Sequence, residues 1–247
     1  MEITPELVVL PDPGTLAEAA ADVILETAQA LVAEKPRFTI ALAGGATPRA
    51  TYARLAAPPR SDAMPWSRTF VFFGDERCVP ADHPDSNLRM ARETLLGKVP
   101  IPPAQVFGMP GDTDEPDAAA AAYARTLAEV FGTRRGEMPR FDLILLGMGI
   151  DGHTASLFPG SPVVKEIFRP VAAVHAAAAA IPQRITLTLP VLNAAALVVF
   201  LVSGREKAKV IKAVLGDNVL LPAGLVRPER GRLVWMLDRA AAGLLKP

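Results

Sequence analysis

The sequence is poor in several features that would set it apart from ordinary globular proteins. It has a single cysteine, Cys78, among 247 residues, which excludes an intramolecular disulfide and is consistent with a reducing compartment. Lysine and arginine together number 26, as do aspartate and glutamate. Balanced charge argues against general binders of nucleic acid or anionic membranes, because those proteins carry a basic excess. We therefore expect neither kind of partner.

Long apolar runs are also missing. The run Ala194–Val202 has nine residues, about half of the roughly 18 needed to span a bilayer. The N-terminal residues show no basic region followed by an apolar core, so no signal peptide is recognisable. Half of the residues are nevertheless hydrophobic, which is enough to bury a sizeable core. These observations predict a cytoplasmic globular protein, and the length allows one large or two small domains.

Short apolar runs alternate with helical patterns along the chain. Strands are expected at 38–43, 69–73, 141–146, 184–189, 197–202 and 233–237, and helices at 16–31, 86–96, 117–131 and 206–215. Apolar strands separated by helices indicate an α/β fold whose mainly parallel sheet is covered on both faces. In such sheets ligands bind beyond the carboxyl ends of the strands, so the loops there are the candidate sites.

Local signals predict where three helices begin. Thr15 and Glu18 have the spacing of a capping box. Thr47 and Pro48 suit the N-cap and first positions of a helix. Asp238 is expected to cap a last helix after the final strand.

The first candidate loop is Gly44-Gly45-Ala46-Thr47. Two glycines let backbone N–H groups approach a ligand closely, and the loop opens a helix whose positive end favours anions. A phosphate cradle and a simple tight turn explain this loop equally well.

The second loop, 74–80, places three consecutive charges directly after an apolar strand. A solvated loop would explain them, but the position at a strand end favours a ligand site. Arg77 suits a carboxylate or phosphate, and Asp75 suits hydroxyl groups. The acidic and histidine residues downstream match no metal motif, and His83 is expected at the surface.

The third loop, 147–154, contains glycines in the pattern G-x-G-x-x-G. This pattern suggests a dinucleotide site, which also needs an acidic residue about 20 positions later. Ile167–Arg205 contains no such residue, and Asp151 at the expected helix entry would repel a pyrophosphate, so we reject that site. His153 instead suits a general base, because imidazole accepts protons near neutral pH.

Two isolated cations also lie beside predicted strands. Arg184 opens the alternating strand 184–189, and Lys207 lies at the start of a helix. A solvated surface position is the commoner fate of such residues, but their place near strand ends favours contact with a phosphate.

Together these segments resemble the 6-phosphogluconolactonases. The matching segments are 43–48, 73–77 with Val79-Pro80, Asp85-Ser86-Asn87, 146–160, Arg184-Ile185-Thr186 and Gly204 with Lys207-Ala208. The resemblance implies one α/β domain over 1–247, related to glucosamine-6-phosphate deaminases and ribose-5-phosphate isomerases. It implies hydrolysis of 6-phospho-D-glucono-1,5-lactone in the oxidative pentose phosphate pathway, with no cofactor or metal.

The resemblance also implies roles for individual residues. His153 would activate water, with Asp151 holding its tautomer, and Arg77 would stabilise either the oxyanion or the phosphate. The remaining substrate-binding residues would be Gly44, Gly45, Ala46, Thr47, Asp75, Gly152, Arg184 and Lys207. The partner would be a sugar-phosphate lactone, bound by a monomer or a small homo-oligomer.

Two positions depart from related patterns. Many relatives carry serine where this chain has Ala43, and the deaminase branch has a glutamate where it has Phe158. That glutamate supports proton transfer between sugar carbons, so Phe158 disfavours a deaminase or aldose–ketose isomerase. A non-catalytic sugar-phosphate sensor would need an output domain, and the sequence has no helix-turn-helix extension or basic tail.

Overall fold

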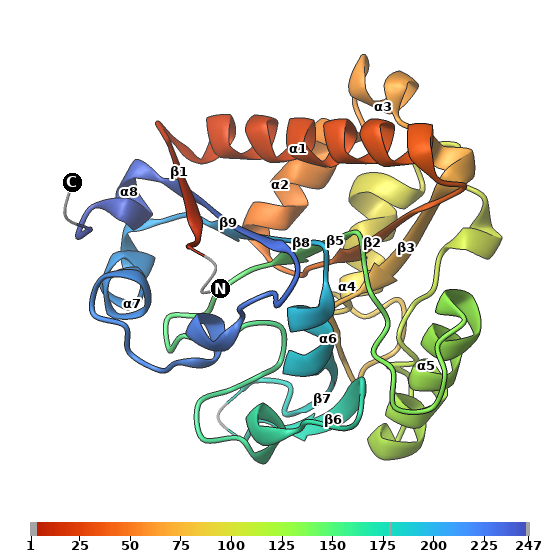
Figure 1. Cartoon of the computed structure of the whole chain (residues 1–247). Coiled ribbons are helices and arrows are strands. Elements are labelled where there is room, and N and C mark those ends of the chain that lie inside the picture. The colour runs from red at the N-terminus through yellow and green to blue at the C-terminus, as the bar shows by residue number, and fades with distance from the viewer. Residues whose placement is uncertain (1–3, 178, 246–247) are drawn as a thin grey trace.

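Six parallel strands form the central sheet of the computed structural model, which describes residues 4–177 and 179–245. In spatial order they are β1 (Glu6–Leu10), β9 (Arg232–Asp238), β8 (Leu197–Val202), β5 (Leu143–Leu146), β2 (Phe38–Leu42) and β3 (Thr69–Phe73). Figure 1 shows helices on both faces of this sheet. The predicted α/β class with a mainly parallel sheet is therefore confirmed.

Apolar runs predict most strands of this sheet closely. β3 and β8 have the predicted bounds, whereas β5 begins two residues later than predicted. Every residue of β8 is buried, as expected for a strand covered on both faces. β1 was not predicted, because it lies at the sheet edge and exposes Leu7 and Val9, which blurs its pattern.

A second, three-stranded antiparallel sheet was also not predicted. It consists of β4 (Asp75–Arg77), β7 (Gln183–Leu187) and β6 (Val171–His175). Residues 75–77, expected in a loop, form a strand because their backbone pairs with β7. Three charged residues carry no local strand signal, so only a distant partner could define β4.

Helices cover the sheet, and those predicted at 16–31, 86–96, 117–131 and 206–215 are found near these bounds, whereas the short helices at 60–63 and 189–194 were not predicted. They are α1 (Pro13–Glu34), α2 (Ala46–Leu55), α3 (Arg60–Ala63), α4 (Asn87–Ala91), α5 (Pro116–Phe131), α6 (Leu189–Ala194), α7 (Ala208–Ile211) and α8 (Arg239–Ala242). π-Helical turns at Arg92–Leu96 and Lys212–Gly216 extend α4 and α7. Asp238 caps α8 as predicted, with its side chain accepting from the Ala241 N–H.

Two predicted helix starts are wrong. Asp12, rather than Thr15, caps α1: its carboxylate accepts from the Thr15 N–H at 2.8 Å, and Pro13 occupies the first turn. An aspartate followed by proline is the stronger start signal. α2 begins at Ala46, with Gly45 as N-cap, so Thr47 and Pro48 each lie two positions deeper in the helix than expected.

Aromatic side chains concentrate in the core despite their low number. Phe200 and Trp235 stack across β8 and β9 with ring centroids 3.8 Å apart. Phe72 contacts both Phe107 and Phe141.

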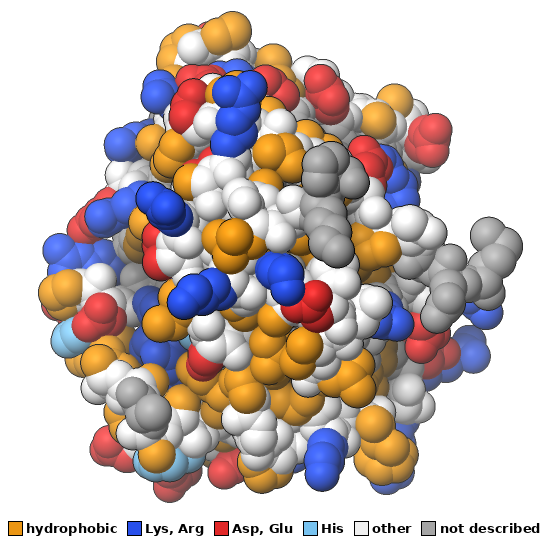
Figure 2. Space-filling model, turned by 90° about the vertical axis from the view of Figure 1, so that its left-hand side faces the viewer, with side chains coloured by type: hydrophobic (Ala, Val, Ile, Leu, Met, Phe, Trp, Pro, Cys, Tyr) orange, Lys and Arg blue, Asp and Glu red, His pale blue; other side chains and the backbone are white. Residues whose placement is uncertain are grey.

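Among the described residues, no helix is long and apolar enough to cross a membrane. On the face drawn in Figure 2, basic and acidic side chains are interspersed, as the balanced composition predicts.

Candidate active site

A cavity of about 380 Å³ lies at the carboxyl ends of β2, β5 and β8. Its wall contains most of the predicted site residues: Gly44, Gly45, Ala46, Thr47, Asp75, Arg77, His153, Arg184 and Lys207. A second cavity, of about 600 Å³ beside Trp235, is lined by none of them. Residues from five separate segments, two of them strands of the second sheet, thus converge near the strand ends, where parallel sheets bind ligands.

The first wall of the cavity is the glycine loop at the start of α2. Gly45 adopts φ +105°, a conformation that favours glycine. The first N–H groups of a helix have no partner within the helix, so those at the start of α2 remain available to an anion. A β-carbon on Gly44 would lie 2.0 Å from Asn87 Oδ1, so this position also requires glycine.

The Tyr52 side chain anchors the backbone of Ala43, directly before this loop. Its hydroxyl donates to the Ala43 carbonyl at 2.8 Å and accepts from the Ala43 N–H at 2.9 Å. Burial raises the pKa of Tyr52, so the hydroxyl keeps its proton and the donated bond. The Tyr52 hydroxyl therefore fixes the backbone at Ala43.

His153 projects into the cavity from the loop after β5. Its Nδ1 lies 2.6 Å from Asp151 Oδ1, and the same oxygen accepts from the His153 backbone N–H at 3.1 Å. Burial raises the pKa of Asp151, but these contacts and the His153 charge outweigh it, and the pKa falls below its usual value. An ionised Asp151 fixes a proton on Nδ1 and leaves Nε2 as the basic nitrogen.

No α-helix follows this loop before β6, in contrast to the expected helix entry. A dinucleotide fingerprint requires a helix there, so its absence independently excludes that site. Gly152, predicted to bind substrate, does not line the cavity. Its φ is +83°, and a β-carbon there would meet Leu221 at 2.6 Å, so Gly152 serves the turn that presents His153.

Phe158 packs against the imidazole on its other side. The His153 and Phe158 rings have centroids 4.5 Å apart, and the Arg184 guanidinium lies 5.5 Å from the Phe158 ring. The side chain at position 158 is thus an aromatic contact of His153 and carries no carboxylate. Among the described residues, Asp151 is the carboxylate that pairs with His153.

Two arginines stand side by side at the cavity. Arg77 and Arg184 are directly opposed in the antiparallel pair of β4 and β7. Burial lowers the pKa of Arg184, and the charge of Arg77 adds to this effect. Opposed like charges destabilise a sheet, so their presence in a cavity wall points to an anionic ligand. The unpredicted second sheet is what pairs them.

Lys207 reaches the cavity from the segment after β8. Asp238, at the end of β9, holds this segment by accepting from Ser203 Oγ at 2.6 Å and from the Gly204 N–H at 3.1 Å. Glu206 and Ser203 also line the cavity and were not predicted. The position of these two residues shortly after a buried strand is the sequence signal that could have identified them.

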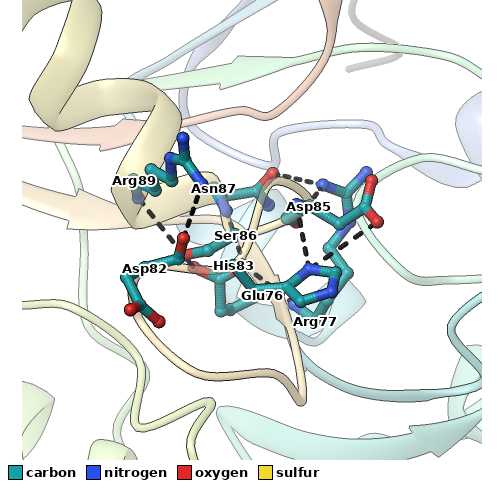
Figure 3. A network of polar contacts seen from close by, with 8 residues as sticks. All are labelled: Glu76, Arg77, Asp82, His83, Asp85, Ser86, Asn87 and Arg89. Carbon is teal, nitrogen blue, oxygen red and sulfur yellow. Dashed lines mark hydrogen bonds and ion pairs between the residues drawn. The ribbon is translucent and has the colours of Figure 1, made fainter.

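Buried polar contacts join the remaining walls. Asp75 Oδ2 accepts from Ser156 Oγ at 2.6 Å, which ties β4 to the loop that carries His153. Glu76 accepts from the backbone N–H groups of Arg77 at 2.9 Å and Asn87 at 2.8 Å (Figure 3). Burial raises the pKa of Glu76 even though these N–H groups lower it. Neither Asn87 nor Ser156 was predicted as a site residue, although both lie in segments that carry the family resemblance.

Comparison with known proteins gives a consistent family. Residues 11–235 match the family model described as glucosamine-6-phosphate isomerases/6-phosphogluconolactonase. A 6-phosphogluconolactonase of Synechocystis is 40% identical over 248 residues, covering 99% of this chain and all of the relative. One of Rattus norvegicus is 41% identical over 240 residues, covering 96% of this chain and 92% of the relative.

Solved structures have the same fold. A 6-phosphogluconolactonase from Trypanosoma brucei matches with a TM-score of 0.83 and 33% identity, covering 99% of this chain and all of its own. A monomeric glucosamine-6-phosphate deaminase matches with a TM-score of 0.80 and 22% identity, covering 97% of this chain and 99% of its own. At that identity the second match indicates a shared fold only.

Proposed function

The chain belongs to the glucosamine-6-phosphate isomerase/6-phosphogluconolactonase family, and we propose that it hydrolyses 6-phospho-D-glucono-1,5-lactone to 6-phospho-D-gluconate. The relatives that it matches are 6-phosphogluconolactonases, so the chain is a lactone hydrolase. The observation that carries the proposed substrate is the cavity itself, where an Asp151-bound imidazole faces Arg77, Arg184 and Lys207. This reaction would serve the oxidative pentose phosphate pathway.

In the proposed mechanism the phosphate anchors the substrate. The N–H groups at the start of α2 and the cations of Arg184 and Lys207 bind it. Binding energy at the phosphate, remote from the reacting carbon, orients the lactone carbonyl toward His153.

His153 then acts as general base and general acid. Nε2 removes a proton from water while the water oxygen bonds to C1, which gives a tetrahedral intermediate. Loop N–H groups or Arg77 stabilise its oxyanion. The bond from C1 to the ring oxygen breaks, and the proton held on His153 passes to that oxygen. The residue pattern lacks a G-x-S-x-G nucleophile elbow, which supports direct attack by water over an acyl-enzyme.

The ring of Phe158 favours this reaction over the deaminase and isomerase alternatives. Those reactions move protons between sugar carbons and require a carboxylate beside the histidine, at the place where Phe158 contacts His153. A hydrolase has no such proton transfer to support.

The test is a rate measurement with freshly prepared phosphorylated lactone, corrected for spontaneous hydrolysis. We expect hydrolysis well above the uncatalysed rate, and a higher KM for unphosphorylated gluconolactone. A corrected rate of zero would refute the proposal. Ammonia release from glucosamine 6-phosphate, or ketose formation from an aldose phosphate, would instead support the alternatives.

A further inference from the structure

A neutral side chain, Asn87, lies between two opposite charges of the site. Arg77 Nη1 donates to Asn87 Oδ1 at 2.9 Å, and Asn87 Nδ2 donates to Asp75 Oδ1 at 3.1 Å and to the Asp75 carbonyl at 2.9 Å. The amide thus presents its acceptor to the cation and its donor to the carboxylate. Figure 3 shows Asn87 directed at the Arg77 guanidinium.

The backbone of Asn87 is fixed independently of these contacts. Glu76, only 2% exposed, accepts from the N–H groups of Asn87 and Leu88, each at 2.8 Å. Ser86 caps α4 by accepting from the Arg89 N–H at 3.2 Å and donates to Glu76 at 3.1 Å. The start of α4 is therefore anchored, and the Asn87 side chain has a defined origin.

The charged neighbours of Asn87 do not pair with one another. Among the residues that the structure describes, no carboxylate lies within ion-pair distance of Arg77. Its other bond from Nη1 goes to the neutral carbonyl of Asp85 at 2.7 Å. Arg77 and Asp75 both line the cavity, and the Asp75 carboxylate accepts from the neutral donors Asn87 and Ser156, so no described residue neutralises either charge.

We propose that Asn87 is a positioning residue that keeps Arg77 and Asp75 apart. Asp75 is only 7% exposed, so an opposite charge beside it would be attracted strongly, and a direct ion pair would withdraw both charges from the substrate. A neutral amide satisfies each charge with one hydrogen bond and cancels neither. Because its amide also touches Gly44, Asn87 sets the spacing between the anion-binding glycine loop and Arg77. This inference rests on the proposed function for its kinetic readout.

Two substitutions separate this role from a purely structural one. Asn87→Ala removes both contacts and lets Arg77 turn toward Asp75, so kcat/KM for the phosphorylated lactone should fall about 10- to 100-fold. Asn87→Asp keeps an acceptor for Arg77 but pairs with its charge, and it also places a second carboxylate beside Asp75. KM should therefore rise although the guanidinium stays held. Asn193→Ala, which removes a half-buried asparagine bonded to Leu225 and Arg227, is the matched control.

A double substitution tests whether Asn87 acts through Arg77. Adding Asn87→Ala to Arg77→Ala should cost much less than it does in the unmodified protein. If the double variant loses kcat/KM by the full product of the two single losses, the proposal is wrong. It is also wrong if Asn87→Ala leaves kcat and KM unchanged and only lowers the melting temperature.

A measurement independent of turnover keeps this test separate from the proposed function. The guanidinium NH signals of Arg77, assigned with Arg77→Lys, should show restricted rotation in the unmodified protein and in Asn87→Asp. In Asn87→Ala they should move to different chemical shifts, because the guanidinium has turned from Asn87 to Asp75. If the unmodified protein lacks lactonase activity, the proposed function fails, but these signals still decide the placement. Identical signals in all three proteins would refute the role of Asn87.

Discussion

The imidazole of His153 is held at one nitrogen and open at the other. Asp151 and Phe158 contact the ring, and neither occupies the cavity wall beside it. The proposed general base therefore has a fixed tautomer and a fixed orientation. His175, exposed on β6, has no such surroundings and offers a comparison within the same chain.

The first prediction concerns His153 itself. His153→Ala should lower kcat at least about a hundredfold, roughly 3 kcal/mol of transition-state stabilisation, while the fold persists. His175→Ala should retain full activity. Steady-state kinetics and circular dichroism on both variants are the measurements, and near-normal turnover of His153→Ala would contradict the mechanism.

The second prediction concerns pH. A protonated imidazole cannot accept a proton from water, so kcat should fall on the acid side. The pKa of Asp151 lies below its usual value, so Asp151 keeps its charge as the pH falls below neutral. The acid limb should therefore report one proton. A flat profile, or a two-proton slope, would count against this assignment.

At the scale of elements, the end of β9 supports the segment that carries Lys207. Asp238 is 1% exposed and accepts from Ser203, Gly204 and the first turn of α8. A single carboxylate thus fixes both a helix start and a wall of the cavity. The Asp238 cap was predicted from sequence, whereas its contact with Ser203 and Gly204 follows from the pairing of β8 with β9.

The third prediction follows from this contact. Asp238→Ala should leave buried donors without partners and lower the free energy of unfolding by about 1–3 kcal/mol. It should also raise KM for the phosphorylated lactone, since Lys207 loses its support. Urea unfolding and kinetics test this, with the exposed Asp217→Ala as control. A stability loss with unchanged KM would separate the helix cap from the site.

At the scale of the whole molecule, zero net charge conceals a local cluster. Arg77 and Arg184 are opposed across β4 and β7, and Lys207 reaches the same cavity from β8. A small phosphate needs only such a pocket, so a neutral chain can still bind an anion. Because this cavity is accessible, dissolved salt should weaken the attraction between its cations and an anionic ligand.

The fourth prediction uses this cluster. Lys207→Ala should raise KM for the phosphorylated lactone with little change in kcat, because phosphate binding is shared by ground and transition states. Lys209→Ala, exposed and outside the cavity, should leave KM unchanged. Added salt should raise KM less in Lys207→Ala than in the unmodified protein. A fall in kcat alone would assign Lys207 another role.

The sequence by itself determined the parallel sheet and most residues of the cavity wall. Buried strands such as 197–202 are apolar throughout, and the loops after parallel strands must meet at one edge. Local patterns of this kind extend over a few residues and are visible without a fold. The residues named at those edges, His153 and Arg77 among them, do line one cavity.

Only the tertiary structure decided what depends on distant partners. β4 exists because β7 pairs with it, and that register places Arg77 beside Arg184. Asn87 gains its role from contacts with Asp75 and Gly44, which belong to other loops. Such contacts have no periodicity along the chain. They are set by the packing of the two sheets, which no local stretch of sequence encodes.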